Sequence, residues 1–301
     1  MTTPDQTLHA RTKPYAQDSS LKSWWYILST TFFLAAALAG TFPGLPLICR
    51  VASSVLAGLL MVRLFVIYHD QQHHAILPKS RLAAAFMRVF GICVLIPNAV
   101  WRSSHDYHHS HNCKLRSAHI GSFPIMTREQ YRQTSRGGRF LYLLMRHPAT
   151  ILFGYVSVFL LGMVIIPFFK SPRKNFDSVP AFLLHATVAT LLVVYCGWLG
   201  LALTLVLPFL IAGALGAYLF YAQHNFPGVI LKDNRGWTFE GAALESSSYL
   251  KTNPIMAWFT ANIGYHHIHH INHRVPFYRL PELYRDIPEF REAKATSLHP
   301  L

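Results

Sequence analysis

The chain has 301 residues, of which 52% are hydrophobic and only 13% are charged. Since an average soluble domain carries about 25% charged residues, this composition and a mean hydropathy of +0.27 indicate a membrane-embedded chain. They exclude a disordered chain, a coiled coil and a disulfide scaffold. The net charge of +14 fits an anionic lipid surface or an acidic protein partner. Because the basic residues flank apolar stretches and form no single stripe, we expect no nucleic-acid partner.

The first third of the chain predicts one helical hairpin. Apolar stretches at residues 24–39 and 47–68 are each near the ~20 residues that a bilayer crossing requires, and a Gly- and Pro-rich turn separates them. Residues 82–100 are also apolar but contain Arg88 and Pro97. We expect this third stretch to lie in the membrane interface or to re-enter the membrane rather than to cross it.

A polar, arginine-rich segment follows at residues 114–147. Within it, Thr127 and Gln130 have the spacing of a capping box, in which two side chains satisfy free amides at a helix start. The pair therefore predicts a helix that begins near Arg128.

Two further apolar regions lie at residues 149–169 and 180–222. The second has about forty nearly uncharged positions, which is too long for one crossing and suits two crossings with a turn near Gly197. The first is followed by a basic loop at 170–174, which the positive-inside rule places in the cytosol. We therefore expect residues 149–169 not to cross.

Together these segments predict an all-α integral membrane protein with four transmembrane helices in two hairpins, interfacial helices, a cytosolic cap and both termini in the cytosol. We expect a single domain over residues 1–301. Its parts are a polar N-terminal tail (1–22), a first hairpin (23–68), two histidine-bearing segments with a cytosolic region (69–148), an interfacial or re-entrant stretch (149–169), a second hairpin (180–222) and a cytosolic histidine-bearing tail (223–301).

Three histidine clusters stand at the ends of apolar stretches, at residues 69–74, 105–109 and 266–270, and a lone histidine follows the last long stretch. Helix positions i, i+3 and i+4 share one face, so the histidines of the second and third clusters converge. Ten imidazoles are too many for one ion, which favours a centre of two metal ions. The candidate ligands are His69, His73, His74, His105, His108, His109, His224, His266, His269 and His270.

Some assignments stay open. On an ideal helix His74 lies roughly 140° from His69, so it joins the same centre only if the helix distorts or a second ion lies on its side. His267 competes with His266. Asp70 and Asp106 each follow the first histidine of a cluster, where a carboxylate accepts the second ring N–H and fixes the tautomer. The other histidines read as ordinary interfacial side chains: His9, His111, His119, His147, His185, His273 and His299.

The clusters resemble the three histidine boxes of the membrane fatty acid desaturase superfamily. The likeness is closest to the bacterial acyl-lipid desaturases and covers roughly residues 20 to 295, including the segments 122–127, 223–225, 242–249 and 264–281. It implies a di-iron centre that faces the cytosol, O₂ as co-substrate, and no bound haem or flavin. It also implies an acyl-lipid or acyl-carrier substrate and location in a bacterial inner membrane.

The resemblance implies a desaturase that inserts a double bond into a long acyl chain with O₂ and two electrons from a separate ferredoxin-like or cytochrome-like donor. We expect the arginine-rich segment, with Arg132 and Arg136, to meet that donor. In some relatives an asparagine four residues before the lone histidine holds one iron through water, but that position here is Phe220. An apolar tunnel should hold the substrate, with five aromatic candidates for its lining: Trp101, Trp237, Tyr249, Trp258 and Phe259.

Two alternatives remain. A related di-iron hydroxylase or ketolase would place oxygen on the chain instead of removing hydrogen. A histidine-rich membrane metal transporter belongs to another class, and it needs ionisable groups within its spans. Residues 180–222 contain only His185, which disfavours a transporter.

Overall fold

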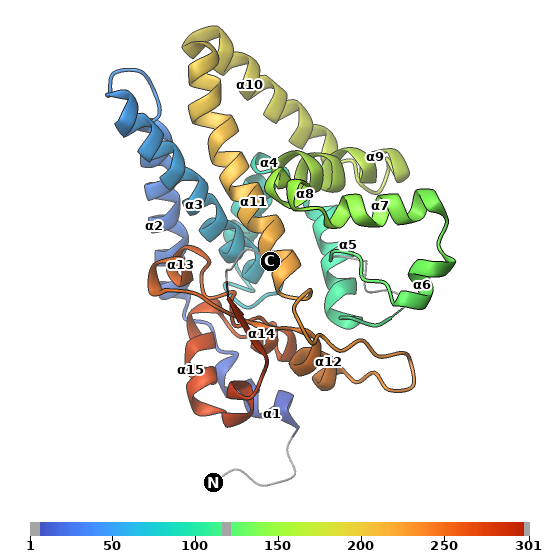
Figure 1. Cartoon of the computed structure of the whole chain (residues 1–301). Coiled ribbons are helices and arrows are strands. Elements are labelled where there is room, and N and C mark those ends of the chain that lie inside the picture. Colours follow the sequence, from blue (N-terminus) through green and yellow to red (C-terminus); the bar gives the residue numbers. More distant parts are fainter. Residues whose placement is uncertain (1–6, 116–121, 298–301) are drawn as a thin grey trace.

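The computed structural model describes residues 7–115 and 122–297, and these residues are largely helical (Figure 1). Helices α2 (Ser20–Ala39) and α3 (Leu47–Gln72) pack side by side as the predicted first hairpin. Buried side chains on α2 recur at Ile27, Leu34 and Ala37, the spacing of one helix face. Helix α3 ends within the first histidine cluster, so this cluster lies at the end of the hairpin, and all of its histidines but the last are buried.

The next apolar stretch is broken. Helices α4 (Arg81–Cys93) and α5 (Asn98–Ser110) meet at an angle of 99°. Pro97 caps the start of α5 and Leu95 has a positive φ of 61°, so the backbone turns sharply between the two helices. This geometry is that of a broken span or a re-entrant loop, so the expectation that residues 82–100 do not cross stays a prediction. The bend brings the second histidine cluster against the end of α3.

The arginine-rich segment forms helices α6 (Arg128–Gln133) and α7 (Arg136–Arg146). The predicted capping box is confirmed: the Thr127 hydroxyl accepts from the Gln130 amide, and the Gln130 side chain accepts from the Thr127 amide. Helix α6 therefore starts at the predicted residue.

Residues 148–170 form a short α8 (Pro148–Leu152), a π-helical segment η2 (Tyr155–Ile165) and α9 (Ile166–Lys170). In Figure 1 this ribbon runs crosswise to α3 and α11. At the crossing, Gly154 and Gly213 approach so closely that a Cβ on Gly154 would lie 2.3 Å from the Gly213 carbonyl oxygen. Only glycine fits at this contact.

The second hairpin consists of α10 (Ser178–Leu201), a π-helical turn η3 (Ala202–Val206) and α11 (Leu207–Ala222). The chain reverses at Gly197, whose φ of 69° and ψ of −177° are open to glycine alone. The turn thus lies where the sequence predicted it, and Figure 1 shows α10 and α11 diverging from it.

Among residues 7–115 and 122–297, two helical stretches are long and apolar enough to cross a membrane: α3, and Ser178–Ala222 with its reversal at Gly197. The bent pair α4–α5 raises this number to three if it forms one span. The protein is therefore a membrane-associated helical protein by composition and helix length. The expected four crossings stay a prediction.

The C-terminal cap contains α12 (Phe239–Ser246), α13 (Pro254–Phe259), α14 (His266–Ile271) and α15 (Leu280–Asp286), with 3₁₀ turns η4 (Phe277–Arg279) and η5 (Pro288–Arg291). A short parallel pair, β1 (Tyr249–Lys251) with β2 (Ala295–Ser297), departs from the all-helical expectation. Helix α14 carries the third histidine cluster and packs on α12 and α15.

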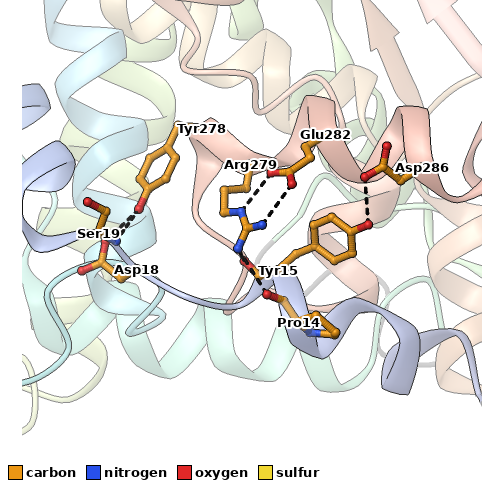
Figure 2. A network of polar contacts seen from close by, with 8 residues as sticks. All are labelled: Pro14, Tyr15, Asp18, Ser19, Tyr278, Arg279, Glu282 and Asp286. Atoms are coloured by element: carbon orange, nitrogen blue, oxygen red, sulfur yellow. Dashed lines mark hydrogen bonds and ion pairs between the residues drawn. The ribbon is translucent and has the colours of Figure 1, made fainter.

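The N-terminal segment folds onto this cap. It forms α1 (Leu8–Thr12) and a 3₁₀ turn η1 (Lys13–Tyr15) where the sequence predicted a polar tail. Figure 2 shows its polar contacts: Arg279 donates to the carbonyls of Pro14 and Tyr15, and the Tyr278 hydroxyl accepts from the Ser19 amide at 2.8 Å. Polar contacts hold this segment together with a few apolar ones, such as the buried Leu8, so hydropathy gave no sign of it.

Replacing Tyr278 by phenylalanine should lower the free energy of unfolding by about 1–2 kcal/mol, because the Ser19 amide and the Asp18 carboxylate both lose their hydroxyl partner. Thermal unfolding of the purified protein in detergent measures this loss. Tyr195, which is 80% exposed, provides the matched control Tyr195→Phe, which should leave stability unchanged. Equal melting temperatures for both variants would contradict the role of this contact.

Candidate metal centre

Nine of the ten histidines predicted as ligands gather into two buried groups. The first, the five-histidine group, consists of His69, His73, His105, His109 and His269. The second, the four-histidine group, consists of His108, His224, His266 and His270. Within each group the candidate ligand atoms lie within 4.8 Å of one another, so each group could hold one ion.

Four elements meet to build the groups. The end of α3 gives the first cluster, α5 gives the second and α14 gives the third, and His224 lies two residues beyond the end of α11. On α5, His105 and His109 join one group and His108 joins the other. On α14, His269 joins the first group, whereas His266 and His270 join the second. Each HxxHH segment therefore contributes to both groups.

The spacing of the nitrogen atoms fits metal coordination. The Nε2–Nε2 distances are 2.9 Å for His69–His105, 3.1 Å for His105–His109 and 3.2 Å for His109–His269. At a metal–nitrogen bond of about 2.1 Å, two ligands at right angles have nitrogens about 3.0 Å apart. The Nε2 of His73 is buried without a hydrogen-bond partner, as expected of an atom reserved for an ion.

The four-histidine group has the same spacing, with Nε2–Nε2 distances of 3.0 Å for His108–His224, 2.9 Å for His224–His266 and 3.1 Å for His266–His270. His224 Nδ1 lies 3.1 Å from the Ser246 carbonyl oxygen, which can only accept a hydrogen bond. The proton therefore sits on Nδ1, and the lone pair of Nε2 points into the group. An all-imidazole donor set suits iron, zinc, copper or nickel.

The electrostatics keep these rings neutral. Burial lowers the pKa of His224 to about 4, and it lowers the pKa values of His266, His269 and His270 well below the ordinary value. Neighbouring imidazoles add to the effect for the last three. An imidazole binds a metal ion only in its neutral form. Because burial favours that form, these rings can bind a cation, and protonating them costs free energy.

The structure corrects the expectation for His74 and decides between His266 and His267. Helix α3 ends at Gln72, and His74 takes a left-handed backbone with φ of 58°, which turns its exposed side chain away from both groups. His267 points to the other side of α14, where its Nε2 lies 3.0 Å from the Phe290 carbonyl oxygen. The helix distortion that would have joined His74 to the centre is absent.

Only one of the two aspartates lies against a candidate ligand. Asp70 is buried, with Oδ1 3.3 Å from His69 Nδ1 and Oδ2 accepting from the Phe277 amide at 2.7 Å. It therefore links the first cluster to the cap. Asp106 is exposed and its carboxylate makes no hydrogen bond to a ring nitrogen of the described histidines, because it lies on the outer side of α5.

Seven histidines have no predicted role at the centre. Those that the structure describes, except His273, make contacts away from both groups. His9 contacts the Ile271 carbonyl, His111 stacks on Tyr107, His147 caps α8, and His185 pairs with Tyr155. His273 differs: its ring centroid lies 4.7 Å from that of His73, beside the five-histidine group. His119 and His299 lie outside the described residues.

An apolar cavity of about 360 Å³ opens beside the five-histidine group. His105 and Trp101 lie in its wall, with their rings stacked at 4.4 Å. Most of the remaining lining comes from η2 and its neighbours: Phe123, Val158, Phe159, Gly162, Met163 and Phe220. Because η2 is apolar throughout, its sequence does not indicate which of its side chains face the cavity.

Of the five aromatic residues expected along a tunnel, only Trp101 lines this cavity. Trp237 donates to the Asn112 carbonyl, Tyr249 stacks on Tyr265, and Trp258 covers the Arg63 guanidinium at 4.0 Å. Phe259 packs on Trp258. These four residues belong to the cap, where they hold polar loops and a buried cation instead of lining the cavity.

A second, polar pocket of about 330 Å³ reaches the five-histidine group from another direction. His73 and His109 line it, together with His273, Asp106 and two exposed arginines, Arg102 and Arg274. The centre thus has an apolar approach along His105 and a basic, polar approach along His73 and His109.

The chain is similar to known proteins over most of its length. The sequence model of the family described as "Fatty acid desaturase" matches residues 46–301. A Bacillus subtilis (strain 168) protein named "Fatty acid desaturase" is 30% identical over 272 residues, which cover 88% of this chain and 76% of that protein. A Synechocystis protein named "sn-1 oleoyl-lipid 12-desaturase" is 21% identical over 261 residues, or 86% of this chain and 74% of that one. The chain therefore belongs to the fatty acid desaturase family and is an oxidoreductase.

Proposed function

We propose that the protein is an acyl-lipid desaturase of the membrane, which uses O₂ and two electrons at a di-iron centre to insert a double bond into a long acyl chain. The observation that carries this proposal is the pair of convergent imidazole groups beside an apolar cavity. Two iron ions held by these groups would supply the O₂ activation that removal of hydrogen from an unactivated CH₂ demands.

The chain's own residues supply binding and positioning. The apolar lining of the cavity suits an extended hydrocarbon that lies against His105 and the stacked Trp101. Asp70 and the Ser246 carbonyl orient His69 and His224. An acyl chain bound in the cavity therefore presents a limited stretch of its carbons to the centre, which is the requirement for regiospecific reaction.

Lipid analysis of a host that expresses the gene tests this function. Gas chromatography–mass spectrometry should show a new unsaturated acyl chain that depends on O₂, and the bond position identifies the carbons that meet the centre. A new hydroxylated or keto chain instead would favour the hydroxylase or ketolase alternative. Absence of any modified lipid, in a host with a competent electron donor, would overturn the proposal.

We propose that the external electron donor approaches through the polar pocket, because two candidate ligands, His73 and His109, line its wall. Two exposed arginines on the rim, Arg102 and Arg274, favour an acidic donor of the ferredoxin or cytochrome type. A donor seated there would deliver electrons to the ligand rings over a short path.

Charge reversal by Arg274→Glu should slow reduction by an acidic donor severalfold at low salt, because rim charges steer association. The difference from wild type should shrink above about 0.5 M salt, where screening is strong. Stopped-flow reduction measures the rate, with bound iron checked in parallel. Arg285→Glu removes an equal charge at an exposed site of α15 and serves as control; equal slowing by both variants would contradict docking at the pocket.

We also propose four crossings, formed by α2, α3, α10 and α11, with residues 149–169 remaining on the cytosolic side. The ends of α3 and α11 must lie on the same side of the membrane because their histidines meet. Each of these helices therefore requires a second helix that crosses the membrane in the opposite direction. The basic loop after α9 favours the cytosol under the positive-inside rule. This topology places the histidine groups on the cytosolic face.

A cysteine at position 171 should be labelled by an impermeant thiol reagent only after the membrane is opened. Ser171 is exposed just beyond α9, and the background should lack Cys49, Cys93 and Cys196 but keep the buried Cys113. A Leu45→Cys variant in the α2–α3 turn, which is exposed and lies on the opposite side in this topology, should label in intact cells. Labelling of position 171 in intact cells would refute this layout.

A further inference from the structure

Helix α7 presents its apolar side outward. Phe140, Leu141 and Leu144 are 69%, 55% and 47% exposed. Its half-buried arginines point the other way: Arg139 donates to the Thr134 carbonyl and Arg146 to the Pro124 carbonyl, each at 2.9 Å. An amphipathic helix on a soluble protein has the reverse arrangement, so this face requires an apolar environment.

The outward apolar face is continuous with a larger surface. Exposed side chains continue through Leu152 at the end of α8, Phe153 just after it, Val156 on η2 and Phe169 on α9. Figure 1 shows α7, α8 and α9 on the same side of the α10–α11 hairpin. Because this surface runs on into helices apolar enough to enter a membrane, the bilayer is the occupant that covers all of it.

Three exposed arginines flank this surface: Arg128, Arg132 and Arg136. They are spaced by four residues, and none of them forms an ion pair within residues 7–115 and 122–297. The nearby Glu129 accepts from Gln133 instead. Unpaired cations beside an interfacial apolar helix attract anionic lipid head groups.

The same surface borders the apolar cavity beside the five-histidine group. Met145 on α7 and Thr150 on α8 line the cavity wall. Arg146 fastens the end of α7 to the segment that carries His224, through hydrogen bonds to Asn225 and to the Tyr221 hydroxyl. A lipid whose head group rests on the arginines therefore has its acyl chains at the cavity, within the layer that α7 faces.

We infer that α6 and α7 form a lipid-docking surface for anionic glycerophospholipids, and that the substrate reaches the cavity laterally as such a lipid within the bilayer. This inference rests on the proposed acyl-lipid function and adds the head-group class. The arginines here were expected to meet an acidic electron donor. A soluble donor offers a polar face, which would leave Phe140, Leu141 and Leu144 uncovered, so the observations favour lipid.

The first test measures the position of α7 without catalysis. A fluorophore on Leu144→Cys, with Cys49, Cys93 and Cys196 replaced, should be strongly quenched by brominated acyl chains in lipid nanodiscs. The same label on Arg285→Cys, exposed at the cap helix α15, should not be quenched. Unquenched Leu144→Cys would overturn the inference, as would its shielding by an added acidic donor in place of lipid, and neither result bears on whether the enzyme desaturates.

The second test measures head-group binding. Arg132→Gln/Arg136→Gln should weaken binding of fluorescent phosphatidylglycerol to the detergent-purified, iron-loaded protein about tenfold and leave phosphatidylcholine binding unchanged. Arg285→Gln/Arg291→Gln removes the same charge from exposed positions of the cap and should change neither lipid. Equal affinities of wild type and the Arg132/Arg136 variant for phosphatidylglycerol would overturn the head-group assignment, even if desaturation is normal.

Discussion

Replacing His108 or His269 by alanine should reduce turnover by roughly 100-fold or more and lower the bound iron, while the protein still inserts into the membrane. Each variant removes one imidazole, His108 from the four-histidine group and His269 from the five-histidine group. Both side chains are buried among other histidines, outside the packing contacts of the helical hairpins, so the variants should still fold. Elemental analysis gives iron per chain, and gas chromatography–mass spectrometry gives the unsaturated product.

His111→Ala is the matched control, because His111 caps the same helix as His108 but stacks on Tyr107 outside both groups. It should keep near-normal iron and activity. Near-normal values for both His108→Ala and His269→Ala would contradict the di-iron assignment. A loss confined to one of them would indicate that only one of the two groups holds an ion needed for turnover.

Most of the site could be predicted from sequence because helix periodicity alone brings i, i+3 and i+4 together. His105, His108 and His109 converge on the centre for this reason, and so do His266, His269 and His270. However, periodicity did not reveal that each triplet divides between the five-histidine group and the four-histidine group. That division follows from which neighbouring element each ring faces, and only the packed structure gives it.

The failures of the sequence prediction have local causes. His74 leaves the centre because α3 ends at Gln72 and the backbone then turns left-handed. Asp106 occupies the exposed side of α5, where adjacency in sequence to a ligand does not mean proximity of side chains. Conversely, His273 lies beside His73 only through tertiary packing, and no spacing rule could have placed it there.

For the fold, too, sequence patterns predicted some features, and only the packed structure gives the others. Apolar length and the Gly and Pro positions were sufficient for the α2–α3 hairpin, the break before α5 and the reversal at Gly197. They were insufficient for α7, because hydropathy identifies an amphipathic helix but not the direction of its apolar face. They were also insufficient for η2, whose apolar residues are nearly uniform around the axis and whose inward side is decided by contact with α11.

The cavity can be tested at Gly162, which lies in its wall on η2. A Cβ built at this glycine would meet only the Ser157 carbonyl oxygen, at the ordinary distance of 3.4 Å, so the backbone tolerates a side chain there. Gly162→Leu should place an isobutyl group in the space that we propose for the acyl chain. Overfilling a fitted apolar site costs about 1–3 kcal/mol, which corresponds to a loss of roughly five- to 150-fold in turnover of the longest chains.

Shorter chains should suffer less from Gly162→Leu, because they leave part of the cavity empty, and Gly162→Ala should fall between wild type and Gly162→Leu. Turnover of a series of acyl lengths, with iron content measured in each preparation, separates a filled cavity from a damaged centre. Val156→Leu is the matched control, since Val156 is 42% exposed on the same π-helical segment and lies outside the cavity wall. An unchanged chain-length profile in Gly162→Leu, with normal iron, would mean that the acyl chain binds elsewhere. A profile shifted toward shorter chains would instead identify η2 as the element that measures substrate length, because only its side chains differ between the variants.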